Sequence, residues 1–153
     1  MNYMDYPRAV RAEELFKEGF NCAQAVFLAF NDLYDVDFDT AAKLSSPFGG
    51  GMGRLREVCG AVSGMFMALG AIYGYEDPKA TTAKKELYAT VQGFAAKFKD
   101  ENGSIICREI FAEGATDTKP QATVRDEKFY KSRPCVEFVK TAAGILEEYI
   151  NAN

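Results

Sequence analysis

Four cysteines are the residues of this sequence most suited to chemistry: Cys22, Cys59, Cys107 and Cys135. No two of them form a CxxC pair, so the local spacing supplies neither a thioredoxin-like motif nor a zinc ribbon. The chain contains no histidine. This excludes a Ser-His-Asp or Cys-His catalytic arrangement, histidine-ligated zinc and a histidine-held haem from this chain alone. Thiol redox chemistry and metal binding through sulfur are the chemistries that remain for the cysteines.

A glycine-rich stretch, FGGGMGR, precedes Cys59. Glycines in such a run can adopt positive φ and leave their N–H groups pointing into a concavity. The stretch matches neither the GxGxxG fingerprint nor the phosphate loop GxxxxGK[ST], and no strand is expected before it. Two interpretations stay open: a tight turn, or a site that binds an anion or a cofactor. The candidate binding residues are Gly49, Gly50, Gly51, Gly53 and Arg54.

The elements that position these residues follow from apolar periodicity, caps and prolines. We expect helices at about 7–18, 21–34, 40–46, 58–75, 78–102, 105–113 and 134–150, with a further short helix within 123–131 as an option. No stretch shows convincing β alternation, and no composition shift marks a second domain. The sequence therefore predicts an all-α fold, a single-domain helical bundle of about six or seven helices spanning 1–153.

The uncharged run at 58–75 is the expected centre of that bundle. Its glycines recur at a spacing of four, Gly60 with Gly64 and Gly70 with Gly74, so each pair lies on one helical face and lets a neighbouring backbone approach closely. The run is long enough to raise a membrane span, but its glycines, serine and tyrosines suit that role poorly. We expect a buried, glycine-rich central helix and no membrane span.

Each cysteine is expected in the first turn of a separate helix. A helix N-terminus carries about half a positive charge, which favours a thiolate and can lower a cysteine pKa from about 8.5 to roughly 3.5–7.5. If consecutive long helices alternate in direction, the starts of the second, fourth and sixth elements share one end of the bundle. The segment 114–132 is long enough to carry the chain back so that the last helix starts there too, and we expect all four sulfurs to gather at this end, beside the glycine stretch. Cys59 is then the best candidate nucleophile. Arginines in this neighbourhood would favour thiolates and glutamates would oppose them: Arg54, Arg56, Arg108 and Arg133 against Glu57 and Glu109.

Composition restricts the partners. The chain is 48% hydrophobic and 26% charged, which fits a folded globular protein. Its net charge of −4 argues against a broad nucleic-acid surface. The first residues, MNYMDYPRAVRAEE, include acidic side chains where a signal peptide needs an apolar region, so we expect a cytoplasmic protein. The apolar content also suits a homo-oligomer, although no sequence feature demonstrates one.

The four cysteines, together with the string CGAVSG at 59–64, resemble the redox-active protein family defined by four cysteines and a CGAxxG motif, the C_GCAxxG_C_C family. The resemblance covers about 16–149 and shows no departure at the motif positions. It implies a redox role that rests on these cysteines, without specifying a reaction.

Three functional hypotheses follow. The first is a thiol-based redox protein, a thiol-dependent oxidoreductase or its accessory protein, whose catalytic residues Cys22, Cys59, Cys107 and Cys135 exchange disulfides or pass electrons to a redox partner protein without a cofactor. In the second, the same four cysteines bind zinc or an iron–sulfur cluster. The third is a non-catalytic helical module that binds a partner subunit or a small anion at the glycine stretch.

Overall fold

A computed structural model of the chain describes residues 2–110, 117–120, 125 and 135–153. The described residues are helical apart from turns and one isolated antiparallel bridge between Val58 and Ile106, so the all-α prediction is confirmed. The α-helices are α1 (Pro7–Lys17), α2 (Cys22–Leu28), α3 (Phe38–Ser45), α4 (Gly49–Met52), α5 (Gly60–Tyr73), α6 (Thr81–Asn102), α7 (Cys107–Ile110) and α9 (Cys135–Ala152). Short 3₁₀ turns occur at Tyr3–Asp5, Asn31–Leu33 and Ser46–Phe48.

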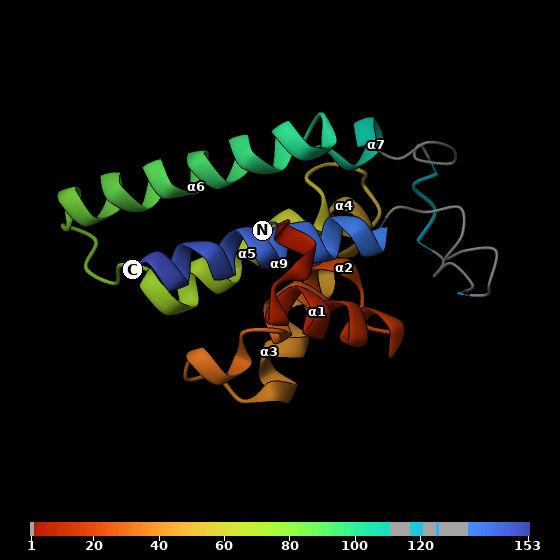
Figure 1. Cartoon of the computed structure of the whole chain (residues 1–153), viewed down its shortest axis with the longest axis horizontal. Coiled ribbons are helices and arrows are strands. Elements are labelled where there is room, and N and C mark those ends of the chain that lie inside the picture. The colour runs from red at the N-terminus through yellow and green to blue at the C-terminus, as the bar shows by residue number, and fades with distance from the viewer. Residues whose placement is uncertain (1, 111–116, 121–124, 126–134) are drawn as a thin grey trace.

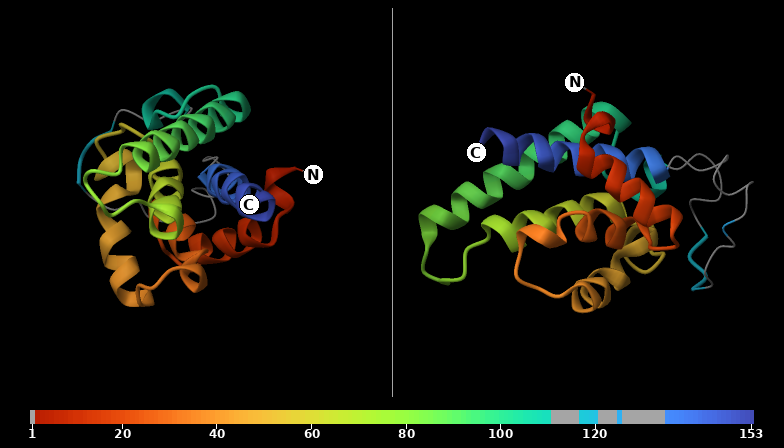
Figure 2. Two further views of the ribbon diagram at one scale, coloured as in Figure 1. Left: turned by 90° about the vertical axis from the view of Figure 1, so that its left-hand side faces the viewer. Right: turned by 60° about the horizontal axis from the view of Figure 1, so that its bottom comes forward.

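Helix α5 packs against α2, α9 and α6 (Figures 1 and 2). Its contact with α2 depends on Gly60 and Gly64, because a Cβ at Gly64 would collide with the carbonyl oxygen of Ala23. The predicted close approach is therefore correct for this pair. It is wrong for the second pair: a Cβ at Gly70 would meet nothing within 4 Å. Helix α5 is buried over its first half, while its last turn, including Tyr73, is exposed.

Helix α6 forms one long edge of the molecule in Figure 1. It is mostly polar, and it buries only Phe94 and Phe98. Phe94 lies edge-on to Tyr149, and Phe98 packs beside Phe138, so both aromatic contacts attach α6 to α9. Within the part of the chain that the structure describes, no helix is long and apolar enough to cross a membrane.

Several predicted boundaries are wrong. Helix α2 ends at Leu28, and a 3₁₀ turn occupies much of the remaining stretch that was expected to be helical. Helix α6 begins at Thr81, because the amide of Lys79 bonds the Asp77 carboxylate and forms a turn there. Helix α7 begins at Cys107, two residues later than expected. The short helix expected within 123–131 and the predicted helix start at Pro134 lie outside the described residues.

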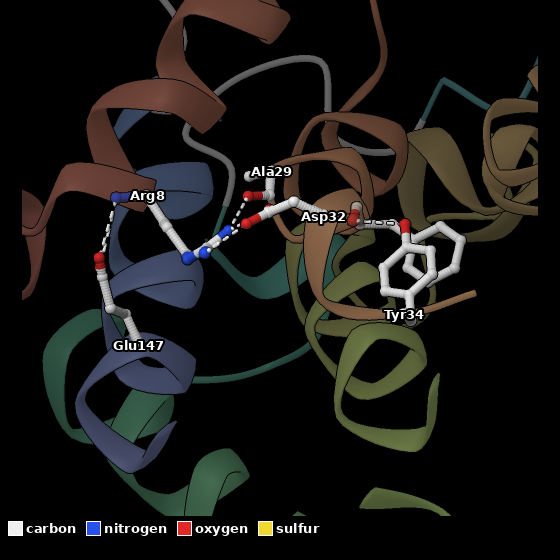
Figure 3. Close-up of polar contacts among 6 residues, drawn as sticks. Arg8, Ala29, Asp32, Tyr34 and Glu147 are labelled. Atoms are coloured by element: carbon white, nitrogen blue, oxygen red, sulfur yellow. Dashed lines mark hydrogen bonds and ion pairs between the residues drawn. The ribbon is translucent and has the colours of Figure 1, made fainter. Parts of the chain in front are cut away.

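A polar junction around Arg8 joins three helices (Figure 3). Its guanidinium donates to the carbonyl of Ala29 at 2.9 Å, just after α2, and pairs with Asp32 at 2.6 Å. Its backbone amide, at the start of α1, donates to the carboxylate of Glu147 at 3.1 Å. Glu147 belongs to α9 and is buried. The junction holds the start of α1 and the end of α2 against α9.

Candidate functional site

The four cysteines lie at or next to the first described residues of four helices. Cys22 is the first residue of α2, and its preceding residue Asn21 caps the helix by accepting from the amide of Gln24. Cys59 is the N-cap residue of α5, and Cys107 is the first residue of α7. Cys135 is the first described residue of α9. All four are free thiols.

One pocket of about 720 Å³ brings the predicted site residues together. All four cysteines line it, and so do all five candidate binding residues of the glycine stretch: Gly49, Gly50, Gly51, Gly53 and Arg54. The helix ends that form it, α4, α7 and the first described turn of α9, lie toward the right-hand side of Figure 1. Helix α4 contacts α2, α5 and α7, which is why residues distant in sequence meet here.

The glycine stretch forms a left-handed turn. Gly50, Gly51, Met52, Gly53 and Arg54 have consecutive φ angles of 66°, 69°, 70°, 59° and 67°. Such a conformation costs a non-glycine residue roughly 1–2 kcal/mol. The amides that follow it bond back into the turn, from Arg56 to the Gly50 carbonyl and from Glu57 to the Gly51 carbonyl. Within the stretch itself, the Gly53 amide donates to the Gly49 carbonyl, so this N–H group is not free to point into the pocket. The expectation for the other glycine amides stays a prediction.

A short pairing of two extended segments places Cys59 beside Cys107. The Cys59 amide donates to the main-chain carbonyl of Ile105 at 2.8 Å, and the Cys107 amide donates to the main-chain carbonyl of Glu57 at 2.6 Å. Both bonds flank the Val58–Ile106 bridge. Gly51 presses against the same pair, since a Cβ there would lie 2.6 Å from Cys107 Cβ. The sequence signal for this pairing is weak, because a bridge this short shows no β alternation.

Cys22 and Cys135 both line this pocket, and each thiol shifts the pKa of the other. Hydrogen bonding from Cys135 is the main cause that lowers the pKa of Cys22, and the positive charges of Arg125 and Arg56 lower it further, against the effect of burial. The same hydrogen bonding and burial raise the pKa of Cys135. Cys22 is partly exposed, whereas Cys135 is buried. The pair thus contains one partly exposed cysteine with a lowered pKa and one buried cysteine with a raised pKa.

Cys59, which the sequence predicts as the best nucleophile, is buried. Burial raises the pKa of the Cys59 thiol, and the nearby Cys22 raises it further. The backbone amides of Ala61 and Val62 favour the thiolate, as expected at a helix start, but their effect is smaller than that of burial. Position at a helix start does not outweigh loss of solvent.

The arginines have different positions from those expected. Arg56 is 2% exposed, and its Nη1 lies 3.9 Å from the sulfur of Cys107. Arg108 pairs with Glu57 at 3.0 Å, and both side chains are about half exposed, so these charges offset each other at the surface. Arg125 lies over the Phe16 ring and lines the pocket, which sequence reasoning missed because no motif marks it. Arg133 lies outside the described residues.

The metal hypothesis required one tetrahedral set of thiolates. Among the described residues, which include all four cysteines, no three or more cysteine, histidine, aspartate or glutamate side chains are grouped so that they could hold a metal ion. The thiols share a pocket without forming such a set.

The chain matches the model of one protein family over residues 20–149, and that family is described as "Putative redox-active protein (C_GCAxxG_C_C)". No curated protein and no solved structure matches this chain significantly. The matched range contains all four cysteines and the glycine turn, the residues that the fold collects around one pocket. The chain belongs to the C_GCAxxG_C_C family of redox-active proteins.

Proposed function

We propose that the protein carries out thiol–disulfide exchange, with Cys22 as the attacking thiolate and Cys135 as the resolving thiol. The observation that carries this assignment is the placement of both thiols in the lining of one pocket, with Cys22 partly exposed and Cys135 buried. An attacking thiol needs access and a substantial thiolate fraction near neutral pH. Of the four cysteines Cys22 meets these requirements best, since it is the least buried and its pKa is lowered.

The exchange balances without an external oxidant other than the disulfide substrate. The Cys22 thiolate attacks one sulfur of that disulfide, so a Cys22–substrate mixed disulfide forms and the other substrate sulfur leaves as a thiolate. Cys135, after losing its proton to solvent or to the departed thiolate, attacks the Cys22 sulfur and releases the second substrate thiolate. The substrate disulfide is reduced to two thiols, and Cys22 and Cys135 are oxidised to one disulfide.

Cys59 and Cys107 are not required in these steps. Both are buried, and burial keeps Cys59 protonated. They form the inner wall of the pocket, where Arg56 contacts Cys107. This proposal therefore assigns the redox role of the family to one pair of cysteines, Cys22 and Cys135.

The test uses the full reduced chain and 4,4′-dithiodipyridine, a neutral disulfide whose thiol product absorbs in the near ultraviolet, where the disulfide itself absorbs little. The unchanged protein should release a second equivalent of product after the first, leaving no adduct. Cys135→Ala should release one equivalent, more slowly than the unchanged protein, and retain the adduct on Cys22, located by peptide mass spectrometry. Cys22→Ala should lack the rapid phase.

Circular dichroism establishes that each variant remains folded. An adduct on Cys59 or Cys107 in Cys135→Ala would overturn the assignment, and so would a rapid phase that survives in Cys22→Ala. A Cys22–Cys135 disulfide in the oxidised, unchanged protein is the expected mapping result.

A further inference from the structure

Helix α6 is long, but it packs against its neighbours at few points. Of its 22 residues only Phe94 and Phe98 are buried, and none of its first half, 81–93, is buried. No ion pair joins two residues of α6, a helix that the structure describes throughout. A helix in water gains most of its stability from packing one face, and a polar helix otherwise relies on many internal ion pairs. The described chain gives α6 little of either.

The outer face of α6 consists of exposed residues at spacings of three or four, which place them on one side of the helix, opposite Phe94 and Phe98. These residues are Lys85, Ala89, Gln92, Ala96 and Asp100. Helix α6 forms a long edge of the molecule in Figure 1, and no other described element lies beyond that edge in this view. The alanines in the middle of the face leave room for a second helix to approach closely.

The two ends of this outer face carry opposite charges. Lys85 lies near its start and Asp100 near its end, and neither forms an ion pair with another described residue. An antiparallel second copy of α6 would bring Lys85 of each copy beside Asp100 of the other. A parallel copy would instead bring like charges together. Exposed ion pairs add little affinity, but they select the orientation and register of two packed helices.

We infer that the outer face of α6 is a homodimer interface, on which α6 of a second copy packs antiparallel with Lys85 of each copy beside Asp100 of the other. Two-fold symmetry makes both ion pairs equivalent, and the surface is complementary to itself. Ala89 of one copy then lies near Ala96 of the other. None of the four cysteines belongs to α6, so the inference does not depend on the proposed exchange.

The test is sedimentation equilibrium of the full reduced chain at low ionic strength, which should show a dimer between about 1 and 100 μM. Lys85→Glu and Asp100→Lys each place like charges opposite each other at both ends of the interface. Each should raise the dissociation constant of the dimer about tenfold. An equimolar mixture of the two variants should recover the original dissociation constant, because opposite charges then face each other at both ends of the mixed dimer.

Lys43→Glu is the matched control, because it makes the same change in net charge at an exposed residue of α3. It should leave the dissociation constant unchanged. Ala89→Arg adds bulk to the middle of the face and should also weaken the dimer. Circular dichroism checks that each variant is folded. A monomeric unchanged protein at about 100 μM would overturn the inference, and so would a dimer that both charge reversals leave intact. Weakening by both variants without recovery in the mixture would overturn the antiparallel pairing.

Discussion

Cys22 and Cys135 line the same pocket, and each thiol shifts the pKa of the other, although one begins α2 and the other is the first described residue of α9. This interaction makes two chemically identical side chains unequal. The pKa of Cys22 is lowered and that of Cys135 is raised. The same inequality is what an exchange reaction needs, since one sulfur must attack first and the other must wait.

The first prediction concerns the hydrogen bonding from Cys135 to Cys22. Cys135→Ala removes the donor, so the pKa of Cys22 should rise and its thiolate fraction at neutral pH should fall. Alkylation of Cys22 by iodoacetamide at pH 7 should slow about three- to tenfold, the factor that one hydrogen bond of about 1 kcal/mol provides. At a pH above both pKa values the two rates should converge. The measurement is the pH profile of the alkylated Cys22 peptide by mass spectrometry.

Cys135→Ser is the matched control, because a serine hydroxyl can donate a hydrogen bond in the same position. It should retain more of the rapid alkylation at pH 7 than Cys135→Ala. Identical profiles for the two variants and the unchanged protein would show that the bond does not set the acidity of Cys22.

The second prediction concerns Arg56, whose positive charge lowers the pKa of Cys22. Arg56→Met removes that charge, so alkylation of Cys22 should slow at pH 7 and approach the unchanged rate at high pH. Arg56→Lys keeps the charge and should restore part of the rate. Arg108→Met should have little effect, because Arg108 pairs with Glu57 at the surface. A slowing of equal size at every pH would indicate a structural disturbance instead of a charge effect.

The location of the site could be predicted from the sequence, but the order of acidity within it could not. Caps such as Asn21 are local signals, and they place Cys22 at a helix start without tertiary information. Burial is not local: Cys59 also starts a helix, yet the elements packed over it raise its pKa. The charge of Arg125 reaches Cys22 only through the fold, so no spacing rule could have assigned it.

The fold shows the same division. The CGAVSG glycines predicted close packing, and Gly64 does press on Ala23. Gly70, at the same spacing, faces open space because no neighbouring helix covers that turn of α5. The left-handed turn of α4 required glycine at Gly50 and Gly51, but Met52 and Arg54 adopt positive φ as well. Surrounding structure imposes that conformation, which propensity disfavours.

The third prediction tests that turn. Gly51→Ala would place a side chain at a φ of 69° and put its Cβ 2.8 Å from Arg56 Cα. The backbone strain and the overlap should together lower the free energy of unfolding by about 2–4 kcal/mol. Gly93→Ala is the control: Gly93 lies within α6 with nothing within 4 Å of the new Cβ, so this change should stabilise by about 0.5–1 kcal/mol. Urea denaturation measures the free energy of unfolding of both variants. An unchanged free energy in Gly51→Ala would show that the turn tolerates a side chain.

The fourth prediction separates the framework from the site. The Glu147 carboxylate accepts the backbone amide of Arg8, at the start of α1, from a buried position on α9 (Figure 3). Glu147→Gln keeps an acceptor but removes a negative charge from a helix N-terminus, so the free energy of unfolding should fall by about 0.3–2 kcal/mol. Glu147→Ala also leaves the Arg8 amide without this acceptor and should cost about 1–3 kcal/mol more.

Glu148→Gln is the control for these two changes. Glu148 is the next residue of α9, and it pairs with Lys97 at 3.2 Å between partly exposed side chains, an arrangement worth about 0–1 kcal/mol. Urea denaturation should therefore rank the losses as Glu148→Gln, Glu147→Gln and Glu147→Ala, from smallest to largest. The alkylation profile of Cys22 should be the same in all three folded variants, because Glu147 lines a different pocket from the cysteines. A shifted Cys22 profile in Glu147→Gln would mean that the junction at Arg8 also sets the geometry of the thiol pair.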